Sequence, residues 1–325
     1  MRILVTGGAG FIGSVATNFF VERNFQVKII DNFSTGSRKF IPKNVEVIDG
    51  DIRDEASLTK ASENCDIILH LAGLALVSES VQKSKEYFSV NHAGTKSLLK
   101  VAEKMNIKSI IFASTCAVYG DDIDQPISEN TTKAPCNPYG ESKLLAENEI
   151  HDWQKKDSNR RAVIFRFFNV SGAYLSQEFG LIGENRIVET HLIPNLVRDK
   201  MAKFNLFGTD FKTPDGTAVR DYIHVQDLCT AFLLGIQHSL KNSGIWFYNL
   251  GSGSGQSVLE VIETYEKIIG RKVNVVKSAR REGDPNILVA EISKVTKELK
   301  WKPEFGLSEI LKSTSSFFNS NIIQN

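Results

Sequence analysis

Short apolar runs recur along the first half of the chain, and each is followed by a segment long enough to form a helix. Residues 2–6, 27–31, 45–48, 66–71, 108–114 and 162–168 form these runs. Continuous apolar runs of this length are typical of strands buried on both faces, and their alternation with helical segments predicts a parallel sheet covered on both sides. We therefore expect an α/β fold with a doubly wound parallel sheet.

Helical periodicity is clearest in residues 92–105 and 139–156, which we expect to pack on the sheet. After residue 169 the regular alternation stops and a looser region begins, so we expect two domains, residues 1–175 and 176–325. The late apolar run 246–250 is an exception, because it has the character of a strand that returns to the first sheet near residues 245–250. We expect the smaller domain to be mixed and the Ser- and Asn-rich tail from about Ser313 to be frayed.

Composition narrows the class of protein without naming it. The chain has 325 residues, 42% of them hydrophobic, and a formal charge of +1, which favours an ordinary globular protein and gives no reason to expect nucleic-acid binding. The cysteines are far apart and form no C-x-x-C pair, so we expect neither disulfides nor a metal site. No apolar run is long enough to span a membrane, and the chain starts directly with a strand, so we expect a cytoplasmic protein.

A glycine-rich turn follows the first strand directly, in the sequence Gly7-Gly8-Ala9-Gly10-Phe11-Ile12-Gly13. A strand, a glycine-spaced turn and a helix form the dinucleotide-binding unit of a Rossmann fold, in which backbone N–H groups meet a pyrophosphate. Gly7 permits the turn, Gly10 leaves room for the phosphates, and Gly13 lets the helix approach the strand. We therefore expect Gly7, Gly10, Phe11, Ile12 and Gly13 to bind the cofactor.

Asp31 ends the second strand at the distance where an acidic residue meets the adenosine ribose. A carboxylate there would repel a 2′-phosphate, and residues 32–34 supply no arginine to bind one. The expected cofactor is therefore NAD rather than NADP.

Tyr139 and Lys143 are four residues apart, so on a helix they share one face. A phenol ordinarily titrates near 10, but a neighbouring ammonium and the positive nicotinamide ring favour the phenolate, which can then act as a base. The third member of this group is a hydroxyl from Ser114 or Thr115, at the carboxyl end of the strand 108–114, where open α/β sheets bind ligands. It can hydrogen-bond the substrate oxygen or the tyrosine.

The motifs T-G-G-x-G-F-I-G, S-T-x-A-V-Y-G and Y-G-x-S-K, in this order, resemble those of the extended short-chain dehydrogenase/reductase family, in its nucleotide-sugar branch. Three later stretches, residues 165–173, 213–225 and 280–284, are similar to UDP-glucose (galactose) 4-epimerases in particular. The resemblance covers nearly the whole chain.

This resemblance implies which residues are catalytic and which bind the cofactor or the substrate. The catalytic places fall on Thr115, Tyr139 and Lys143. Beyond the glycine turn, the implied cofactor contacts are Asp31, Asn32, Asp51, Ile52, Leu71, Ala72, Gly73, Asn91, Ser114, Tyr139 and Lys143. The implied substrate contacts are Thr115, Asn169, His191, Leu192, Asn205, Phe207, Arg220, Arg281 and Asp284.

Within that substrate set, the resemblance places Asn169, Arg220 and Arg281 at the diphosphate, Phe207 against uracil and Asp284 at the uridine ribose. Guanidinium groups suit a diphosphate, because their N–H groups donate in pairs. The neighbouring Asp221 does not face Arg220, so we expect this arginine to be unpaired and available for a ligand.

Three positions depart from the family's pattern. Ala75 stands where some epimerases place a pyrophosphate-contacting lysine, His191 stands where an asparagine is frequent, and Leu288 is intermediate between the bulky and small residues that govern the size of the sugar. How tightly NAD is held and which sugar is preferred therefore stay open.

These features together favour an NAD-dependent 4-epimerase of a UDP-hexose that works through a transient 4-keto sugar. Close alternatives are epimerases of a UDP-N-acetylhexosamine or a UDP-pentose. A 4,6-dehydratase or decarboxylase is less favoured, because Cys116 and Ala117 follow Thr115 where those enzymes carry a carboxylate. A non-catalytic NAD-binding sensor is the least favoured, because Tyr139 and Lys143 are both present. The expected partners are a UDP-sugar and a second copy of the chain, paired through residues 92–105 and 139–156, with no nucleic acid and no membrane.

Overall fold

The computed structural model describes residues 1–121, 123–186, 189–198, 203–281 and 284–322. The chain divides into two compact units, each made of several segments. Unit 1 contains residues 1–120, 132–166 and 229–248, and unit 2 contains residues 121–131, 167–228 and 249–325. The two units are described separately below.

Unit 1 is built on one sheet, which among the described residues has seven strands in the order β13-β6-β5-β4-β1-β2-β3. The strands are β1 (Arg2–Thr6), β2 (Gln26–Asp31), β3 (Glu46–Asp49), β4 (Ile67–His70), β5 (Ser109–Thr115), β6 (Arg161–Phe167) and β13 (Gly244–Leu250). The central neighbours pair in parallel, from β3 through β2, β1 and β4 to β5. The carboxyl ends of these strands therefore meet at one edge of the sheet, which is the edge that binds ligands in open α/β folds.

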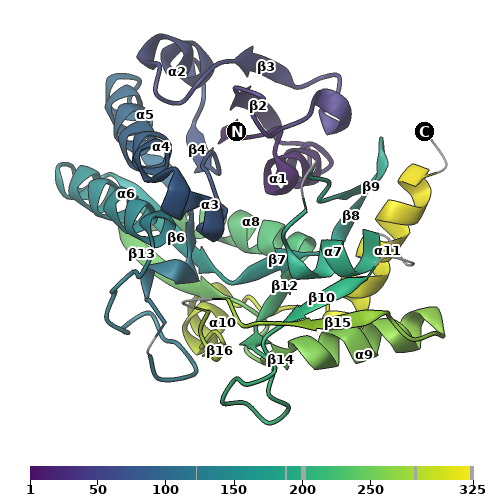
Figure 1. The fold of residues 1–325 in the computed structure, drawn as a ribbon. Helices are drawn as coiled ribbons and strands as arrows, with labels where there is room; N and C mark the ends of the chain where they lie inside the picture. The colour runs from purple at the N-terminus through teal and green to yellow at the C-terminus, as the bar shows by residue number, and fades with distance from the viewer. Residues whose placement is uncertain (122, 187–188, 199–202, 282–283, 323–325) are drawn as a thin grey trace. The chain divides into compact units, whose positions relative to one another are not determined.

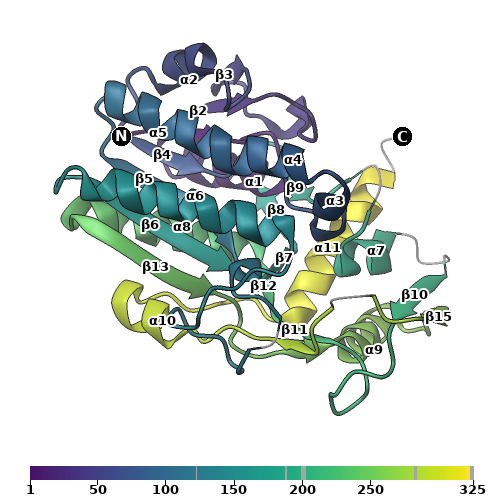
Figure 2. The same ribbon diagram turned by 60° about the vertical axis from the view of Figure 1, so that its left-hand side comes forward.

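Helices cover both faces of this sheet, so it is doubly wound as the apolar pattern predicts (Figures 1 and 2). The helices of the unit are α1 (Phe11–Val21), α2 (Glu55–Ser62), α3 (Val77–Gln82), α4 (Ser84–Tyr87), α5 (Gly94–Lys104), α6 (Pro138–Lys155) and α8 (Val225–Lys241), with short turns η1 (Arg38–Phe40), η2 (Phe88–Ala93) and η3 (Cys116–Val118). The last helix begins in unit 2 and runs mainly in unit 1.

Alternate residues of each strand face opposite helix layers, as period-2 geometry requires. Ile30 and Ile164 belong to the core formed with α2, α5 and α6. Ile29 packs against Gly8 of the turn that precedes α1, and Phe165 packs against Phe232 of α8. Every apolar run expected to be a strand in the first half of the chain is one, to within two residues, and β13 lies beside β6 in the same sheet.

Unit 2 is mixed and contains short strands in small sheets. Its strands are β7 (Asn169–Ser171), β8 (Ala173–Ser176), β9 (Gly180–Gly183), β10 (Phe204–Phe207), β11 (Val219–Arg220), β12 (Tyr222–His224), β14 (Gln256–Ser257), β15 (Val275–Ser278) and β16 (Ile287–Leu288). Its helices are α7 (Leu192–Arg198), α9 (Val258–Ile269), α10 (Ser293–Leu299) and α11 (Leu307–Ile322). The described strands pair as β10-β15, β14-β11-β16, β12-β7 and β8-β9.

The expectation of a frayed tail is wrong, because α11 continues to residue 322. Phe317 and Phe318 are buried, and Thr314 hydrogen-bonds back to the Ile310 carbonyl inside the helix. Ser316, Asn319 and Ser320 lie on the exposed face of this amphipathic helix, whereas Thr314 and Ser315 are buried. In the part of the chain that is described, no helix has the length and apolar character needed to cross a membrane.

Candidate active site

The glycine turn of residues 7–13 joins β1 to α1 in unit 1 with very close backbone packing. Gly7 has a φ of 70°, and a Cβ there would lie 2.7 Å from the Cα of Ala72. A Cβ on Gly13 would lie 2.0 Å from the carbonyl oxygen of Gly7. Only glycine permits both approaches, so the turn and the first helix are held as a dinucleotide-binding unit requires.

Space opens at the start of α1, by contrast. Among the described residues, a Cβ on Gly10 would meet just the Gly7 carbonyl oxygen, at 3.5 Å. Phe11 and Ile12 form the first turn of the helix beside this space. Unpaired N–H groups and the positive end of the helix dipole fit the diphosphate of NAD at this position.

Asp31 lies against this turn at the end of β2. Its carboxylate accepts hydrogen bonds from the backbone N–H groups of Ala9 (2.9 Å) and Phe33 (2.8 Å). Burial raises the pKa of Asp31, and the two hydrogen bonds act in the opposite direction. The side chain is therefore held where the ribose-binding acid of the motif is expected.

Asn32 and Asp51 meet at the neighbouring end of β3. The Asn32 amide donates to Asp51 (2.9 Å), and the Arg53 guanidinium donates to the same carboxylate from Nε and Nη2 (2.8 and 2.7 Å). The hydrogen bond from Arg53 lowers the pKa of Asp51 to about 2, so this carboxylate is ionised. Ile52 is buried beside Gly94 of α5, so its side chain faces the core of the unit.

Asn91 connects three of the expected cofactor segments. Its Oδ1 accepts from the N–H of Leu74 (2.8 Å), and its Nδ2 donates to the Leu74 carbonyl (3.0 Å) and to the Ser142 hydroxyl (3.0 Å). A Cβ on Gly73 would lie 2.9 Å from the Asn91 amide oxygen and 3.8 Å from Lys143 Nζ. The loop after β4, the η2 turn and α6 are thus gathered at one place.

The loop after β4 is also held to β1. Leu71 donates its N–H to the Thr6 carbonyl (3.2 Å), and Ala72 donates to the Thr6 hydroxyl (3.1 Å). His70, the last residue of β4, lies between the hydroxyls of Thr6 (2.7 Å) and Thr95 (3.0 Å). These bonds order the segment that carries the expected cofactor contacts.

Ser114 and Thr115 end β5, and their hydroxyls have different partners. Ser114 donates to the Glu147 carboxylate (2.6 Å) inside the unit. Thr115 accepts from the Ala117 N–H (3.1 Å) and caps the η3 turn. Because the Ser114 hydroxyl is occupied inside the unit, Thr115 is the better candidate to bind a substrate oxygen.

The first turn of α6 packs directly on the segment that follows Thr115. The Asn137 side chain caps the helix by accepting from the Gly140 N–H (2.9 Å), and Pro138 occupies the first helical position. A Cβ on Gly140 would lie 2.3 Å from the Ala117 carbonyl oxygen. The helix that carries Tyr139 therefore starts at the carboxyl end of β5.

Tyr139 and Lys143 are both buried and share one face of α6. The Tyr139 ring meets the Tyr87 ring edge-on, with centroids 6.3 Å apart. Burial lowers the pKa of Lys143 to about 7, and the Glu147 carboxylate acts in the opposite direction. The ammonium also lies 4.3 Å from the centre of the Phe112 ring. A tyrosine and a lysine in a dehydrated setting are suited to proton transfer near neutral pH.

Several residues of this site are not among those that the sequence predicts. Tyr87, Glu147 and Arg166 are buried around the Tyr139–Lys143 face. The sequence could have indicated Glu147, because it follows Lys143 by four residues and therefore lies on the same face of the helix. Arg166 lies in one of the quoted motifs, but only the fold shows that it pairs with Glu147.

In unit 2, Arg220 and Asp284 form an ion pair between Nη2 and Oδ1. Arg220 also donates to the carbonyl of Val219 (2.8 Å). The expectation that Arg220 is unpaired is therefore wrong, because a residue 64 positions away supplies the carboxylate. The register of β11 with β16 places Leu288 directly beside Arg220.

Phe207 and Arg281 also meet, with the guanidinium carbon 4.3 Å from the ring centre. Asn205 and Phe207 lie on the same face of β10, since they are two residues apart. The parallel pairing of β10 with β15 brings Phe207 beside Ser278, close in the chain to Arg281. Residues 282–283, which belong to the quoted 280–284 motif, lie outside the described residues.

Asn169 begins β7 and is exposed, and its backbone N–H donates to the Asp221 carbonyl (3.0 Å). Asp221 follows Arg220, so this bond fixes the Asn169 backbone close to the end of β11. In unit 2, the expected diphosphate and uridine contacts thus lie on β7, β10 and β11 and on the segment between β15 and β16.

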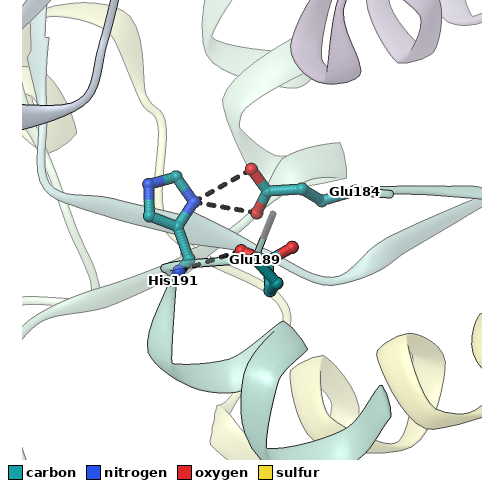
Figure 3. Close-up of side chains that lie close together, drawn as sticks. All are labelled: Glu184, Glu189 and His191. Carbon is teal, nitrogen blue, oxygen red and sulfur yellow. Dashed lines mark hydrogen bonds and ion pairs between the residues drawn. The ribbon is translucent and has the colours of Figure 1, made fainter. Parts of the chain in front are cut away.

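His191 lies next to Leu192, the first residue of α7, and belongs to a separate cluster with Glu184 and Glu189 (Figure 3). Its ring Nδ1 lies 2.9 and 3.0 Å from the two Glu184 oxygens, and its backbone N–H donates to the Glu189 carboxylate (2.9 Å). One ligand atom from each of the three lies within 4.8 Å of the others, as a metal site would require. Arg186 also donates to Glu184 (2.7 Å), so an ion-pair network accounts for the cluster.

The NAD dependent epimerase/dehydratase family model matches residues 3–251. A UDP-glucose 4-epimerase of Lactobacillus helveticus is 39% identical over 94% of this chain and 92% of its own length. Among solved structures, UDP-glucose 4-epimerase from Bifidobacterium longum in complex with NAD⁺ and UDP is 38% identical, with a TM-score of 0.92 over 99% of both chains. UDP-glucose-4-epimerase from Stenotrophomonas maltophila with bound NAD and formylated UDP-arabinopyranose is 30% identical, with a TM-score of 0.93 over 100% of both chains.

Proposed function

The chain belongs to the NAD dependent epimerase/dehydratase family, and on this premise we propose that it inverts C4 of a UDP-hexose, with UDP-glucose and UDP-galactose as the substrate pair. The observation that carries the proposal is the placement of Tyr139 and Lys143 on a helix that starts at the end of β5. The glycine turn and Asp31, which suit NAD, lie in the same unit.

In the proposed reaction, the Tyr139 phenolate removes the proton from the 4-hydroxyl of the sugar, and the Thr115 hydroxyl hydrogen-bonds that oxygen. Lys143 supplies a positive charge one helical turn away, which favours the phenolate. NAD⁺, held by the glycine turn and Asp31, would supply a reversible hydride acceptor for C4 when bound, so that the 4-keto sugar can be reduced from its other face. Tyr139 then gives the proton back, so the acid-base group is restored in each cycle.

For the cofactor, we propose that residues 7–13 hold the diphosphate and that Asp31 and Asn32 bind the adenosine ribose. Asp51 and Ile52 would contact adenine, and Asn91 and Lys143 the nicotinamide half. Asp51 accepts from the Asn32 amide but is paired with Arg53, so the charge that disfavours a 2′-phosphate is that of Asp31.

For the substrate, we propose that Asn169, Arg220 and Arg281 bind the diphosphate, that Phe207 packs on uracil and that Asp284 binds the uridine ribose. The Arg220–Asp284 pair and the Arg281–Phe207 contact support this assignment, because each brings together two residues expected to touch neighbouring parts of UDP. The remaining proposed substrate contacts are His191, Leu192 and Asn205.

A UDP-N-acetylhexosamine or a UDP-pentose is the alternative substrate class. Leu288 lies beside Arg220 and is intermediate in size, so it does not decide between these sugars. Dehydration or decarboxylation is disfavoured, because the η3 turn after Thr115 contains residues 116–118 and no carboxylate. We further propose a cytoplasmic location.

The test is a panel of UDP-sugars incubated with the protein and followed by NMR of the anomeric and H4 signals, which reports both the substrate and the inverted centre. Tyr139→Phe is expected to lower turnover of UDP-galactose by about 10²- to 10⁴-fold, since the acid-base group is lost. UDP affinity should be retained, because the proposed UDP contacts are in other residues. Turnover equal to that of the unaltered protein in this variant would dismiss the assignment.

We also propose a homodimer in which α5 and α6 of two copies form a four-helix interface. The two helices lie side by side on one face of the sheet (Figure 2), and the His92 imidazole reaches from the η2 turn to Glu149 of α6 (3.0 Å). Sedimentation is expected to give the mass of two chains at micromolar concentration, and a monomer would contradict the proposal.

A further inference from the structure

A fully buried polar network begins at Glu147, one helical turn after Lys143 on α6. Glu147 is 2% exposed and Arg166 is 1% exposed. The Arg166 guanidinium donates to both Glu147 oxygens, from Nε (2.9 Å) and Nη2 (2.6 Å). Its Nη1 donates to the Tyr119 hydroxyl (2.9 Å), and the Phe247 ring lies 4.8 Å from the guanidinium carbon. All three guanidinium nitrogens and both carboxylate oxygens therefore have a partner.

The network joins the segments that carry the proposed catalytic residues. Ser114, which precedes Thr115, donates its hydroxyl to Glu147 (2.6 Å). Glu147 follows Lys143 by one helical turn on α6, and Tyr119 follows the η3 turn. The carboxylate is therefore bonded to β5 and to β6 while it stands on the helix of Tyr139 and Lys143.

The charged and titratable groups around Lys143 are few among the described residues. Glu147 acts on it from the same helix, and His70 faces it from β4. Burial, and then the Lys143 charge, lower the pKa of His70 to about 3, so this imidazole is neutral. Phe112 of β5 contributes only its ring face. Glu147, which also pairs with Arg166 of β6, is thus the carboxylate that acts on the ammonium among the described residues.

We propose that Glu147 is a positioning residue that keeps the Lys143 ammonium charged, and that Arg166 and Ser114 hold the Glu147 carboxylate in place for this task. The inference rests on the proposed function, because it concerns the lysine that favours the Tyr139 phenolate. Without the carboxylate, the buried lysine loses its proton more easily, and the phenolate loses its stabilising cation.

A purely structural role predicts a different result from the same substitution. A buried ion pair that serves only to hold the fold would, when broken, lower activity equally at every pH. A counter-charge for Lys143 instead changes the pH at which Tyr139 ionises. The pH dependence therefore separates the two roles.

The experiment compares Glu147→Gln with Glu149→Gln, the same change two residues later on α6, where the side chain is partly exposed. The first readout is the tyrosinate absorbance of the NAD-loaded protein across pH, with the matching Tyr139→Phe protein subtracted. Glu147→Gln is expected to raise the ionisation midpoint of Tyr139 by about one pH unit, while Glu149→Gln leaves it unchanged.

The second readout is turnover of UDP-galactose. Glu147→Gln is expected to lower kcat at neutral pH by about 10-fold and to change KM less than about 2-fold. Glu147→Asp, which keeps the charge, should recover part of the loss. An unchanged midpoint, or a loss of kcat that is the same at every pH, would overturn the proposal.

Because Glu147→Gln leaves Arg166 buried without its partner, this variant can fail to fold. The double variant Glu147→Gln/Arg166→Met removes both charges, a change that proteins tolerate better than breaking a pair. It is expected to show a raised Tyr139 midpoint as well, and an unchanged midpoint in the folded double variant would overturn the proposal. If no UDP-sugar is turned over, the proposed function fails, but the tyrosinate titration still tests the role of Glu147.

Discussion

His70 is completely buried at the end of β4, with Thr6 on one side of its ring and Thr95 on the other. Burial lowers its pKa to about 3, and Lys143 acts in the same direction. The folded protein therefore keeps His70 neutral at a pH where the unfolded chain, with a pKa near 6.5, binds a proton. Because folding depresses the pKa of this base, the contribution of His70 to the free energy of unfolding is fully present above about pH 6.5 and is lost as the pH falls towards 3.

We predict that His70 makes the free energy of unfolding measurably dependent on pH. Between about pH 7.5 and pH 5 the protein should lose about 2 kcal/mol of unfolding free energy through His70, and the variant His70→Asn should not lose it. Urea unfolding of both proteins at the two pH values measures the difference. His224 has a pKa lowered by burial to about 4, but it is present in both proteins and cancels. A stability gap that does not change with pH would contradict the prediction.

Some residues of the proposed site could be predicted from the sequence and others could not. The glycines, Asp31 and the Tyr139–Lys143 pair depend on local spacing, which the sequence displays. The partners of Asp284 and Glu147 depend on strand order, because Arg220 and Arg166 reach them only after the chain has folded. Pairs of this kind leave no local pattern.

At the scale of elements, the start of α6 depends on one close approach. Gly140 leaves room for the Ala117 carbonyl, which would lie 2.3 Å from a Cβ. We predict that Gly140→Ala moves the first turn of α6 away from the end of β5, costs about 1–3 kcal/mol in stability and lowers kcat by at least about 10-fold. Calorimetric unfolding and steady-state kinetics measure the two effects.

The matched control for this prediction is Asn148→Ala, an exposed position on the same helix. Its stability should lie within about 0.5 kcal/mol of the unaltered protein. UDP binding should be normal in both variants, since the proposed UDP contacts lie in unit 2. Full activity in Gly140→Ala would show that the contact with Ala117 does not position Tyr139.

Helix α11 shows where sequence patterns failed at this scale. Its residues are rich in Ser and Asn, which favour turns in isolation, but Phe317 is 1% exposed and packs against Gly183 of β9. Tertiary burial of the apolar face outweighs the weak local propensity. The short strands of unit 2 were missed for a related reason, because two- or three-residue strands carry no periodicity to detect.

We therefore predict that α11 is necessary for the stability of unit 2. Phe317→Ala should lower the free energy of unfolding by about 3–5 kcal/mol, because it removes a buried ring and leaves a cavity. Ser316→Ala, at the exposed neighbouring position, is the control and should change it by less than about 0.5 kcal/mol. If the two variants unfold at the same urea concentration, the helix is not part of the core.

At the scale of the whole molecule, each unit is assembled from separate stretches of the chain. Unit 1 regains α8 and β13 after the chain has passed through unit 2. Strong apolar runs made the parallel sheet predictable, since burial on both faces leaves a clear pattern. The sequence does not predict that α8 belongs to unit 1, because the pattern of an amphipathic helix does not indicate which sheet the helix covers.

This division predicts that cofactor and nucleotide binding can be impaired independently. Arg220→Gln removes a guanidinium that we assign to the UDP diphosphate, and the loss of one charge-assisted hydrogen bond should weaken UDP binding by about 10- to 100-fold. The NAD content of the purified protein should not change, because the proposed NAD contacts lie in unit 1.

Tyr139→Phe should retain UDP binding and lose turnover, because it changes the acid-base group and none of the proposed UDP contacts. Arg271→Gln, an exposed arginine after α9, is the charge-matched control and should bind UDP normally. Calorimetry with UDP and absorbance of bound NAD measure the two affinities. If Arg220→Gln binds UDP as tightly as the control, the Arg220–Asp284 pair is a structural ion pair, and the diphosphate must be bound by Arg281 and Asn169 without it.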